Sequence, residues 1–274
     1  MKCFPALISL PLLAGLIPPS ASASTRICCV GNSITQGNYP DDLQELLGDD
    51  YTVIDRGIQS TTMLRNGNAP YWESSQFSSL FSDRPDIITI MLGTNDSKAS
   101  NWDSFRGEFA DDCRALLDTF STIETQPVLY LCLPPPAFPP ETHSISAYNI
   151  EHGVVPLLRE VADRRGVPLI DVHTPLKDSV EYFPDHVHPN HDGEKAIARI
   201  IYETLAGDTD LVATANSAER PALPAEPRGD VRQASPLWRV NGRLVREKGE
   251  DLPSGWVIRN PGAAPSRKVL VKRK

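Results

Sequence analysis

The stretch RICCVGNSITQG (residues 26–37) joins a short apolar run to a small polar turn. The apolar run is continuous and contains β-branched residues, which is typical of a strand that is buried on both faces. The turn places one serine, Ser33, between Gly31 and Gly37. A serine at this position either caps the following helix or is displayed as a nucleophile at the end of the strand.

Four more apolar runs follow at intervals, with amphipathic segments between them. The runs are YTVID (51–55), DIITIML (86–92), PVLYLCL (127–133) and VPLIDV (167–172). We expect helices over residues 40–47, 102–120, 145–165 and 193–205, where apolar residues recur at helical spacing. Strands that alternate with helices predict a three-layer α/β/α domain built on a parallel sheet, with its site at the carboxyl ends of the strands.

The two ends of the 274-residue chain differ from this body. Residues 1–23 combine a lysine, an apolar core and a small-residue cleavage site, so they are predicted to be a signal peptide rather than a transmembrane anchor. The predicted domain covers residues 25–207. A linker rich in alanine and proline (208–234) then leads to a segment of alternating apolar and polar residues (235–274), which predicts a few short antiparallel strands.

Charge is unevenly distributed along the chain. The formal net charge is −8, yet residues 228–274 carry 12 basic and 4 acidic residues. The acidic body argues against a nucleic-acid partner, and the basic residues of the tail are dispersed through a strand pattern. Four cysteines remain after signal removal: Cys28, Cys29, Cys113 and Cys132. A disulfide between them is possible, but three lie in strand-like runs, where cysteine often serves as a small buried apolar residue.

Polar residues that follow the predicted strands supply what acyl transfer requires. Ser33 could attack a carbonyl carbon if His188 accepted its proton, and Asp185 could orient that imidazole. The backbone N–H groups of Ser33 and Gly57, with the side-chain amide of Asn95, could bind the developing oxyanion. The sequence lacks the GxSxG motif of the usual α/β-hydrolases.

These blocks, in this order, resemble the SGNH subgroup of GDSL-type esterases: GNSITQG, the turn at Gly57, GTND (93–96) and DHVHP (185–189). The resemblance covers about residues 26–205. It implies a flavodoxin-like sheet of five parallel strands and ester hydrolysis without a metal or organic cofactor. It also implies Ser33, Asp185 and His188 as the triad, with Gly57 and Asn95 as oxyanion donors. Asn32 departs from the family pattern, in which many members have aspartate.

Two alternatives to this interpretation remain. His186, His188 and His191 with Asp185 could bind a metal ion, although their spacing matches no established ligand pattern. A non-catalytic carbohydrate-binding protein could also use an esterase fold, because fold alone does not prove activity. The other histidines of the mature chain are expected to have no catalytic role: His143, His152 and His173.

Tyr71, Trp72 and Trp102 lie in predicted loops and are candidate substrate-binding residues. The stretches around them resemble those of secreted bacterial esterases that deacetylate sugars. We therefore expect an O-acetyl ester of a polysaccharide or of sialic acid as substrate, with lipid or aryl esters as the alternative. The terminal segment resembles the C-terminal sorting domain of bacterial type IX secretion, which implies the outer-membrane secretion machinery as a partner and a secreted or cell-surface location.

Overall fold

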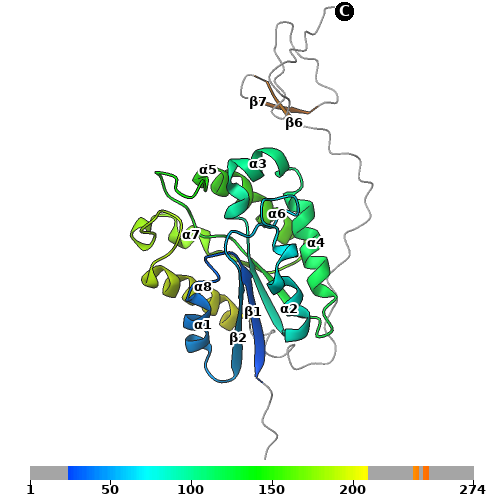
Figure 1. The fold of residues 1–274 in the computed structure, drawn as a ribbon, viewed down its shortest axis with the longest axis vertical. Coiled ribbons are helices and arrows are strands. Elements are labelled where there is room, and N and C mark those ends of the chain that lie inside the picture. Colours follow the sequence, from blue (N-terminus) through cyan, green and yellow to red (C-terminus); the bar gives the residue numbers. More distant parts are fainter. Residues whose placement is uncertain (1–23, 209–236, 241–242, 247–274) are drawn as a thin grey trace, which may run out of the picture.

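Five parallel strands form the centre of the molecule, in the order β2-β1-β3-β4-β5 (Figure 1). The structure is a computed structural model and describes residues 24–208, 237–240 and 243–246. The strands are β1 (Thr25–Gly31), β2 (Tyr51–Gly57), β3 (Ile87–Met91), β4 (Val128–Cys132) and β5 (Leu169–Ile170). This confirms the predicted three-layer fold with a five-stranded parallel sheet.

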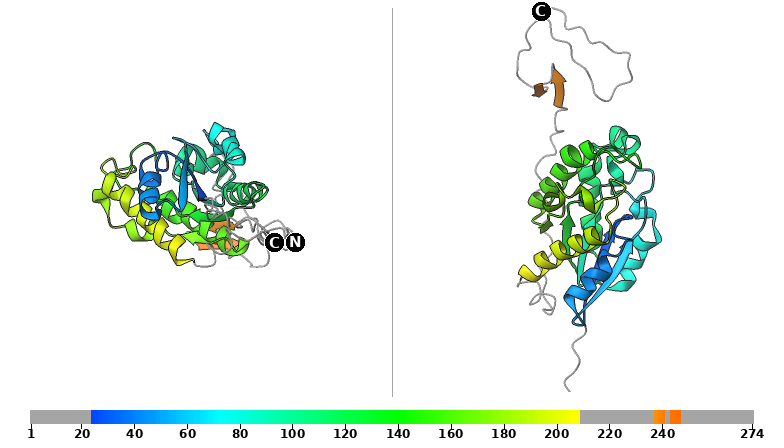
Figure 2. Two further views of the ribbon diagram at one scale, coloured as in Figure 1. Left: turned by 90° about the horizontal axis from the view of Figure 1, so that it is seen from below. Right: turned by 90° about the vertical axis from the view of Figure 1, so that its left-hand side faces the viewer.

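Successive residues of β1 point to opposite faces of the sheet. Cys28 and Val30 pack into one hydrophobic cluster, while Ile27 and Cys29 pack into the other, and all four are fully buried. Because both faces of the sheet carry apolar side chains, helices cover both of them (Figure 2). One face holds α2 (Ser75–Asp83), α4 (Phe109–Ser121) and α6 (Val155–Arg165); the other holds α1 (Tyr39–Leu47), α7 (His173–Leu176) and α8 (His191–Gly207).

Two of the predicted helices are interrupted in the structure. The helix expected over 102–120 is two helices, α3 (Ala99–Phe105) and α4, separated by a turn at Gly107. The one expected over 145–165 consists of α5 (Ala147–Asn149), a π-helical turn (Ile150–Val154) and α6. Gly153 lies within the π-helical turn, where a Cβ would lie 2.3 Å from the ring of Trp102, so only glycine allows this close approach. Helix α2 was not predicted, since its serine-rich sequence is typical of a loop.

The described part of the chain also settles the state of the cysteines. Cys28, Cys29, Cys113 and Cys132 are all buried and free. Burial raises the pKa of the Cys29 and Cys113 thiols to about 12. These cysteines therefore act as small apolar core residues, as their positions in the sequence suggested.

The ends of the chain are described only in part. A short antiparallel pair, β6 (Leu237–Val240) and β7 (Arg243–Arg246), lies within the predicted C-terminal β segment. The predicted signal peptide (1–23), nearly all of the linker and the rest of the C-terminal segment lie outside the described residues. Among the described residues, no helix has the length and apolar character that crossing a bilayer requires.

The sheet order determines where a site can form. The chain leaves β1 toward β2 on one side, whereas β3 pairs with β1 on the other side. In open parallel sheets, the crevice at such a reversal is the usual ligand-binding position. The loops that follow β1 and β3 flank this point, and they carry Ser33 and Asn95.

Candidate active site

The loop after β1 folds back tightly over the ends of two strands. Gly31 and Gly57 pair at the ends of β1 and β2, and both contact this loop. A Cβ on Gly57 would lie 2.3 Å from the backbone nitrogen of Gln36, so only glycine fits there. The N-cap of α1 is Asn38, five residues beyond Ser33. Ser33 therefore does not cap the helix, and it is half-buried in the turn.

The segment before α8 forms its own compact turn. Oδ1 of Asp185 accepts hydrogen bonds from the backbone N–H of Val187 at 3.0 Å and of His188 at 2.6 Å. Asn190 caps α8 by accepting from the N–H of Gly193 at 3.0 Å. Because the turn and the helix cap are adjacent, the imidazole of His188 is held at a defined position over the sheet edge.

Ser33, His188 and Asp185 meet in one hydrogen-bonded row. Nε2 of His188 lies 3.0 Å from Oγ of Ser33, and Nδ1 of His188 lies 2.7 Å from Oδ2 of Asp185. An ionised carboxylate can only accept hydrogen bonds, so Nδ1 carries the proton and Nε2 of the neutral ring faces the serine as an acceptor. Burial would raise the pKa of Asp185, but hydrogen bonds from the side chain and backbone of His188 and the backbone of Val187 hold it well below its usual range.

Glu194 links the two halves of this arrangement. Its side chain, buried in the first turn of α8, accepts from the backbone N–H and the side-chain amide of Asn38, both at 3.0 Å. The loop of Ser33 is thereby tied to the helix that follows His188. No pattern in the sequence singled out Glu194, because acidic residues are common in the first turn of a helix.

Asn95 begins a short 3₁₀ turn (Asn95–Ser97) after β3 and is almost fully buried. Nδ2 of Asn95 donates to the backbone carbonyl of Thr61 at 3.2 Å. The backbone carbonyl of Asn95 accepts from Nδ2 of Asn101 at 2.8 Å. The neighbouring Asp96 accepts from the backbone N–H of Met63 at 3.0 Å and of Leu64 at 2.8 Å. These bonds hold the turn rigidly against residues 61–64.

Gly57 lies at the end of β2 and Asn32 in the loop after β1, and each has a hydrogen-bond partner close to it in the chain. The N–H of Gly57 donates to Oδ1 of Asp55 at 2.6 Å, so an oxyanion would have to compete with this bond. The oxyanion role of Gly57 stays a prediction. Asn32 is buried, and its Oδ1 accepts from the N–H of Ile34 at 3.0 Å. The residue at this position therefore takes part in the hydrogen bonding of the loop that carries Ser33.

The three candidate aromatic residues are not equally placed. Tyr71 is fully buried and donates its hydroxyl to the carbonyl of Arg56 at 2.8 Å, while Trp102 packs against Phe109 in the core. Neither ring is available to a substrate in this structure, because their apolar surface is used to build the core. Trp72 is partly exposed, with the guanidinium of Arg65 3.8 Å above its ring.

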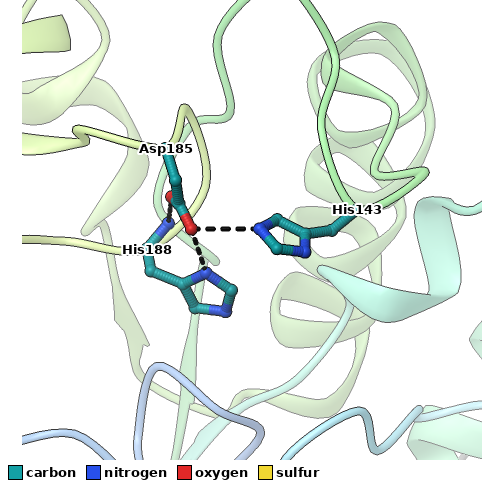
Figure 3. Close-up of side chains that lie close together, drawn as sticks. All are labelled: His143, Asp185 and His188. Atoms are coloured by element: carbon teal, nitrogen blue, oxygen red, sulfur yellow. Dashed lines mark hydrogen bonds and ion pairs between the residues drawn. The ribbon is translucent and has the colours of Figure 1, made fainter.

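His143 lies against Asp185, although no sequence motif singled it out. Its Nε2 lies 3.1 Å from Oδ2 of Asp185 (Figure 3). His143, Asp185 and His188 present ligand atoms within 4.8 Å of one another, a grouping that could hold a metal ion. This grouping differs from the predicted one, which combined Asp185 and His188 with His186 and His191. Nδ1 of His186 is buried and has no hydrogen-bond partner in the described residues. Nδ1 of His191 lies 4.0 Å from a carboxylate oxygen of Glu194.

A parallel sheet in this order, with a serine, a histidine and an aspartate joined at its carboxyl edge, defines the α/β/α hydrolases of the SGNH type. The chain belongs to the GDSL-like lipase/acylhydrolase family, whose model matches residues 29–196. The match includes all of the residues placed at the site above. It confirms the family that the four sequence blocks resembled.

Individual relatives agree with this assignment. The chain is 34% identical over 212 residues to an acetylxylan esterase of Xylanibacter ruminicola; the match covers 68% of this chain but only 44% of that esterase. Among solved structures, an aryl esterase of M. smegmatis superposes with a TM-score of 0.55 at 22% identity, covering 67% of this chain and 99% of that one. A carbohydrate acetylesterase of Sinorhizobium meliloti gives a TM-score of 0.54 at 19% identity, with coverage of 67% and 99%. At these identities the two structures support the fold.

Proposed function

We propose that the protein is a serine esterase that removes O-acetyl groups from a polysaccharide. The observation that carries the proposal is the row Ser33–His188–Asp185, with distances of 3.0 Å and 2.7 Å along it. Both distances are within hydrogen-bonding range before any substrate binds, as nucleophilic catalysis by serine requires. Family membership and the match to an acetylxylan esterase support the same reaction class.

The reaction follows from this geometry. Oγ of Ser33 attacks the acetyl carbonyl carbon while its proton passes to Nε2 of His188, and Asp185 stabilises the resulting imidazolium. The ester C–O bond then breaks, and His188 returns the proton to the departing sugar oxygen. Water attacks the acetyl-serine with His188 again as base, which releases acetate and restores Ser33.

Asn95 is the oxyanion donor with the best support. A side-chain amide has two N–H groups, and the bond to the carbonyl of Thr61 uses one of them. The second N–H group is available for the oxygen that becomes negative. Because Asn95 is buried, that interaction is stronger than it would be in water. The backbone N–H groups of Ser33 and Gly57 complete the proposed hole, with Gly57 released from Asp55 when substrate binds.

The exposure of the site supports an ester on a large substrate. His188 and Asp185 have 38% and 39% of their side chains exposed, so a polymer can approach them without entering an enclosed pocket. Tyr148 on α5 is 65% exposed, and its ring lies tilted against that of His152 with centroids 4.5 Å apart. Helix α5 is joined to the turn of Asn95, because Nδ2 of Asn149 donates to the carbonyl of Ser97 at 2.8 Å. An exposed tyrosine ring on a helix that is bonded to this turn suits the apolar face of a sugar.

Release of acetate from a panel of esters tests the proposal. The panel contains acetylated xylan, acetylated pectin, O-acetyl sialic acid, a short-chain lipid ester and an aryl acetate. We expect the highest kcat/KM on an acetylated polysaccharide and a loss of roughly 10⁶-fold in kcat on the aryl acetate for a folded Ser33→Ala protein. Near-normal release by that variant would contradict the mechanism. Binding of xylan without any hydrolysis would favour the non-catalytic carbohydrate-binding alternative.

We also propose that the protein is exported from a bacterium and that residues 235–274 are a sorting segment. The β6–β7 pair agrees with a small β unit in this part of the chain. A protein that ends at Asp210 should keep full activity on an aryl acetate but stay in the periplasm of the native host. If truncation instead spares export and weakens only activity on insoluble polysaccharide, the segment is a binding module.

A further inference from the structure

Two imidazoles from distant segments share one oxygen of Asp185. Oδ2 lies 2.7 Å from Nδ1 of His188 and 3.1 Å from Nε2 of His143, and the two rings meet edge-on with centroids 5.1 Å apart (Figure 3). Because the carboxylate only accepts, both rings must donate an N–H to it. His143 therefore bonds to Asp185 through a protonated Nε2, whatever the state of its other nitrogen.

The loop after β4 holds His143 in this position. The side chain of Thr142 donates to the carbonyl of Asp185, and the N–H of Phe138 donates to the carbonyl of His186 at 2.9 Å. His143 and Ser144 both have left-handed backbone conformations, with φ of 53° and 59°. Non-glycine residues rarely adopt such conformations, which persist where surrounding contacts determine them. His143 is thus placed by its loop, although 53% of its side chain is exposed.

On these grounds we propose that His143 is a positioning residue of the esterase, which orients the Asp185 carboxylate toward His188. The proposal rests on the function proposed above. Oδ1 of Asp185 is occupied by two backbone N–H groups, so His143 supplies the remaining donor beside His188. This second donor fixes the direction in which Oδ2 of Asp185 faces Nδ1 of His188.

Few other ionisable groups face this pair. In the described residues, the titratable side chains in hydrogen-bond or ring contact with Asp185 or His188 are His143 and the pair itself. Glu141, two residues before His143, accepts from the N–H of Ala147 at 3.1 Å instead. His186 follows Asp185 in the chain but has a buried Nδ1 without a partner there. A change in the pH profile of a His143 variant therefore reports on Asp185 and His188.

Profiles of kcat and kcat/KM against pH on an aryl acetate test the inference, in wild type and in His143→Ala, His143→Gln and His191→Ala. We expect His143→Ala to lower the plateau of kcat about tenfold with little change in KM, because Asp185 loses the donor that orients it beside His188. Glutamine can still donate to Asp185, so His143→Gln should recover most of the plateau. His191→Ala, an exposed histidine outside the row, should match wild type.

The outcomes separate this inference from the proposed function. If Ser33→Ala abolishes hydrolysis but both His143 variants follow the wild-type profile, His143 has no positioning role. A lower plateau of kcat without rescue by glutamine, or with an equal change in KM, would also overturn it, because it would indicate a purely structural contact. Circular dichroism of each variant identifies loss of folding, and His143→Gln keeps the test valid if the alanine variant does not fold. Absence of activity in wild type contradicts the proposed function instead.

Discussion

Oγ of Ser33 lies 3.0 Å from Nε2 of His188, although 155 residues separate the two along the chain. The two residues leave the carboxyl edge of the sheet from different places: Ser33 follows β1, and His188 precedes α8. Glu194 joins these places by bonding to Asn38, so the contact does not depend on the two side chains alone. This relationship carries the predictions below.

Replacement of the proposed base should almost abolish turnover. His188→Ala should lower kcat by roughly 10⁴–10⁶, because no other described group is placed to accept the proton of Ser33. His191→Ala is the matched control, and it should retain wild-type kcat on an aryl acetate. A chelator such as EDTA should not change activity. Loss of activity with EDTA and its recovery with added zinc would instead assign a metal to the group formed by His143, Asp185 and His188.

Removal of the Asn95 amide should affect the transition state more than substrate binding. We expect Asn95→Ala to lower kcat by roughly 10²–10³ with little change in KM, because the amide binds strongly only when charge develops on the oxygen. Asn66→Ala is the control, since Asn66 is an asparagine of a neighbouring loop that bonds to Glu108. A higher KM with unchanged kcat would make Asn95 a residue of ground-state binding.

Tyr148 should matter for sugars and not for small esters. We expect Tyr148→Ala to lower kcat/KM about fivefold on acetylated xylo-oligosaccharides, equivalent to about 1 kcal/mol of lost stacking, and to leave kcat/KM on an aryl acetate unchanged. Phe81→Ala is the control, because Phe81 is an exposed aromatic residue of α2. Equal losses on both substrates would place Tyr148 in the structure of the site rather than in sugar recognition.

The stability of the protein should depend on pH through Asp96. Burial raises the pKa of this carboxyl to about 6, against the backbone hydrogen bonds from Leu64 and Met63 that lower it. The unfolded value is about 3.9. Because the folded state holds the proton more tightly, the contribution of Asp96 is fully present below pH ~4 and is lost as the pH rises through about 6.

This dependence is measured as a difference between two proteins. The free energy of unfolding of Asp96→Asn, relative to wild type, should increase by on the order of 3 kcal/mol between pH 4 and pH 7. Urea denaturation at several pH values measures it, with Asp103→Asn as the control because Asp103 is exposed on α3. A constant difference across that range would mean that the pKa of Asp96 is the same in the folded and unfolded states.

The local sequence pattern was sufficient to predict an element where its residues suit a single environment. The strand of residues 26–30 is apolar on both faces, and the structure buries both faces under helices. The pattern failed where helices are interrupted, because an isolated glycine such as Gly107 or Gly153 is tolerated within a helical pattern and does not by itself mark a break. It also failed for Tyr71 and Trp102, whose aromatic side chains suit a core as well as a binding surface.

The sequence by itself determined the layered fold, the family and the identity of Ser33, Asp185, His188 and Asn95 as site candidates, because each of these depends on residue types at short spacing. Only the tertiary structure decided that Glu194 ties the loop of Ser33 to α8 and that His143 shares Oδ2 of Asp185. These are contacts between segments up to 156 residues apart. Their geometry is set by how the loops pack at the sheet edge, and no local periodicity encodes that packing.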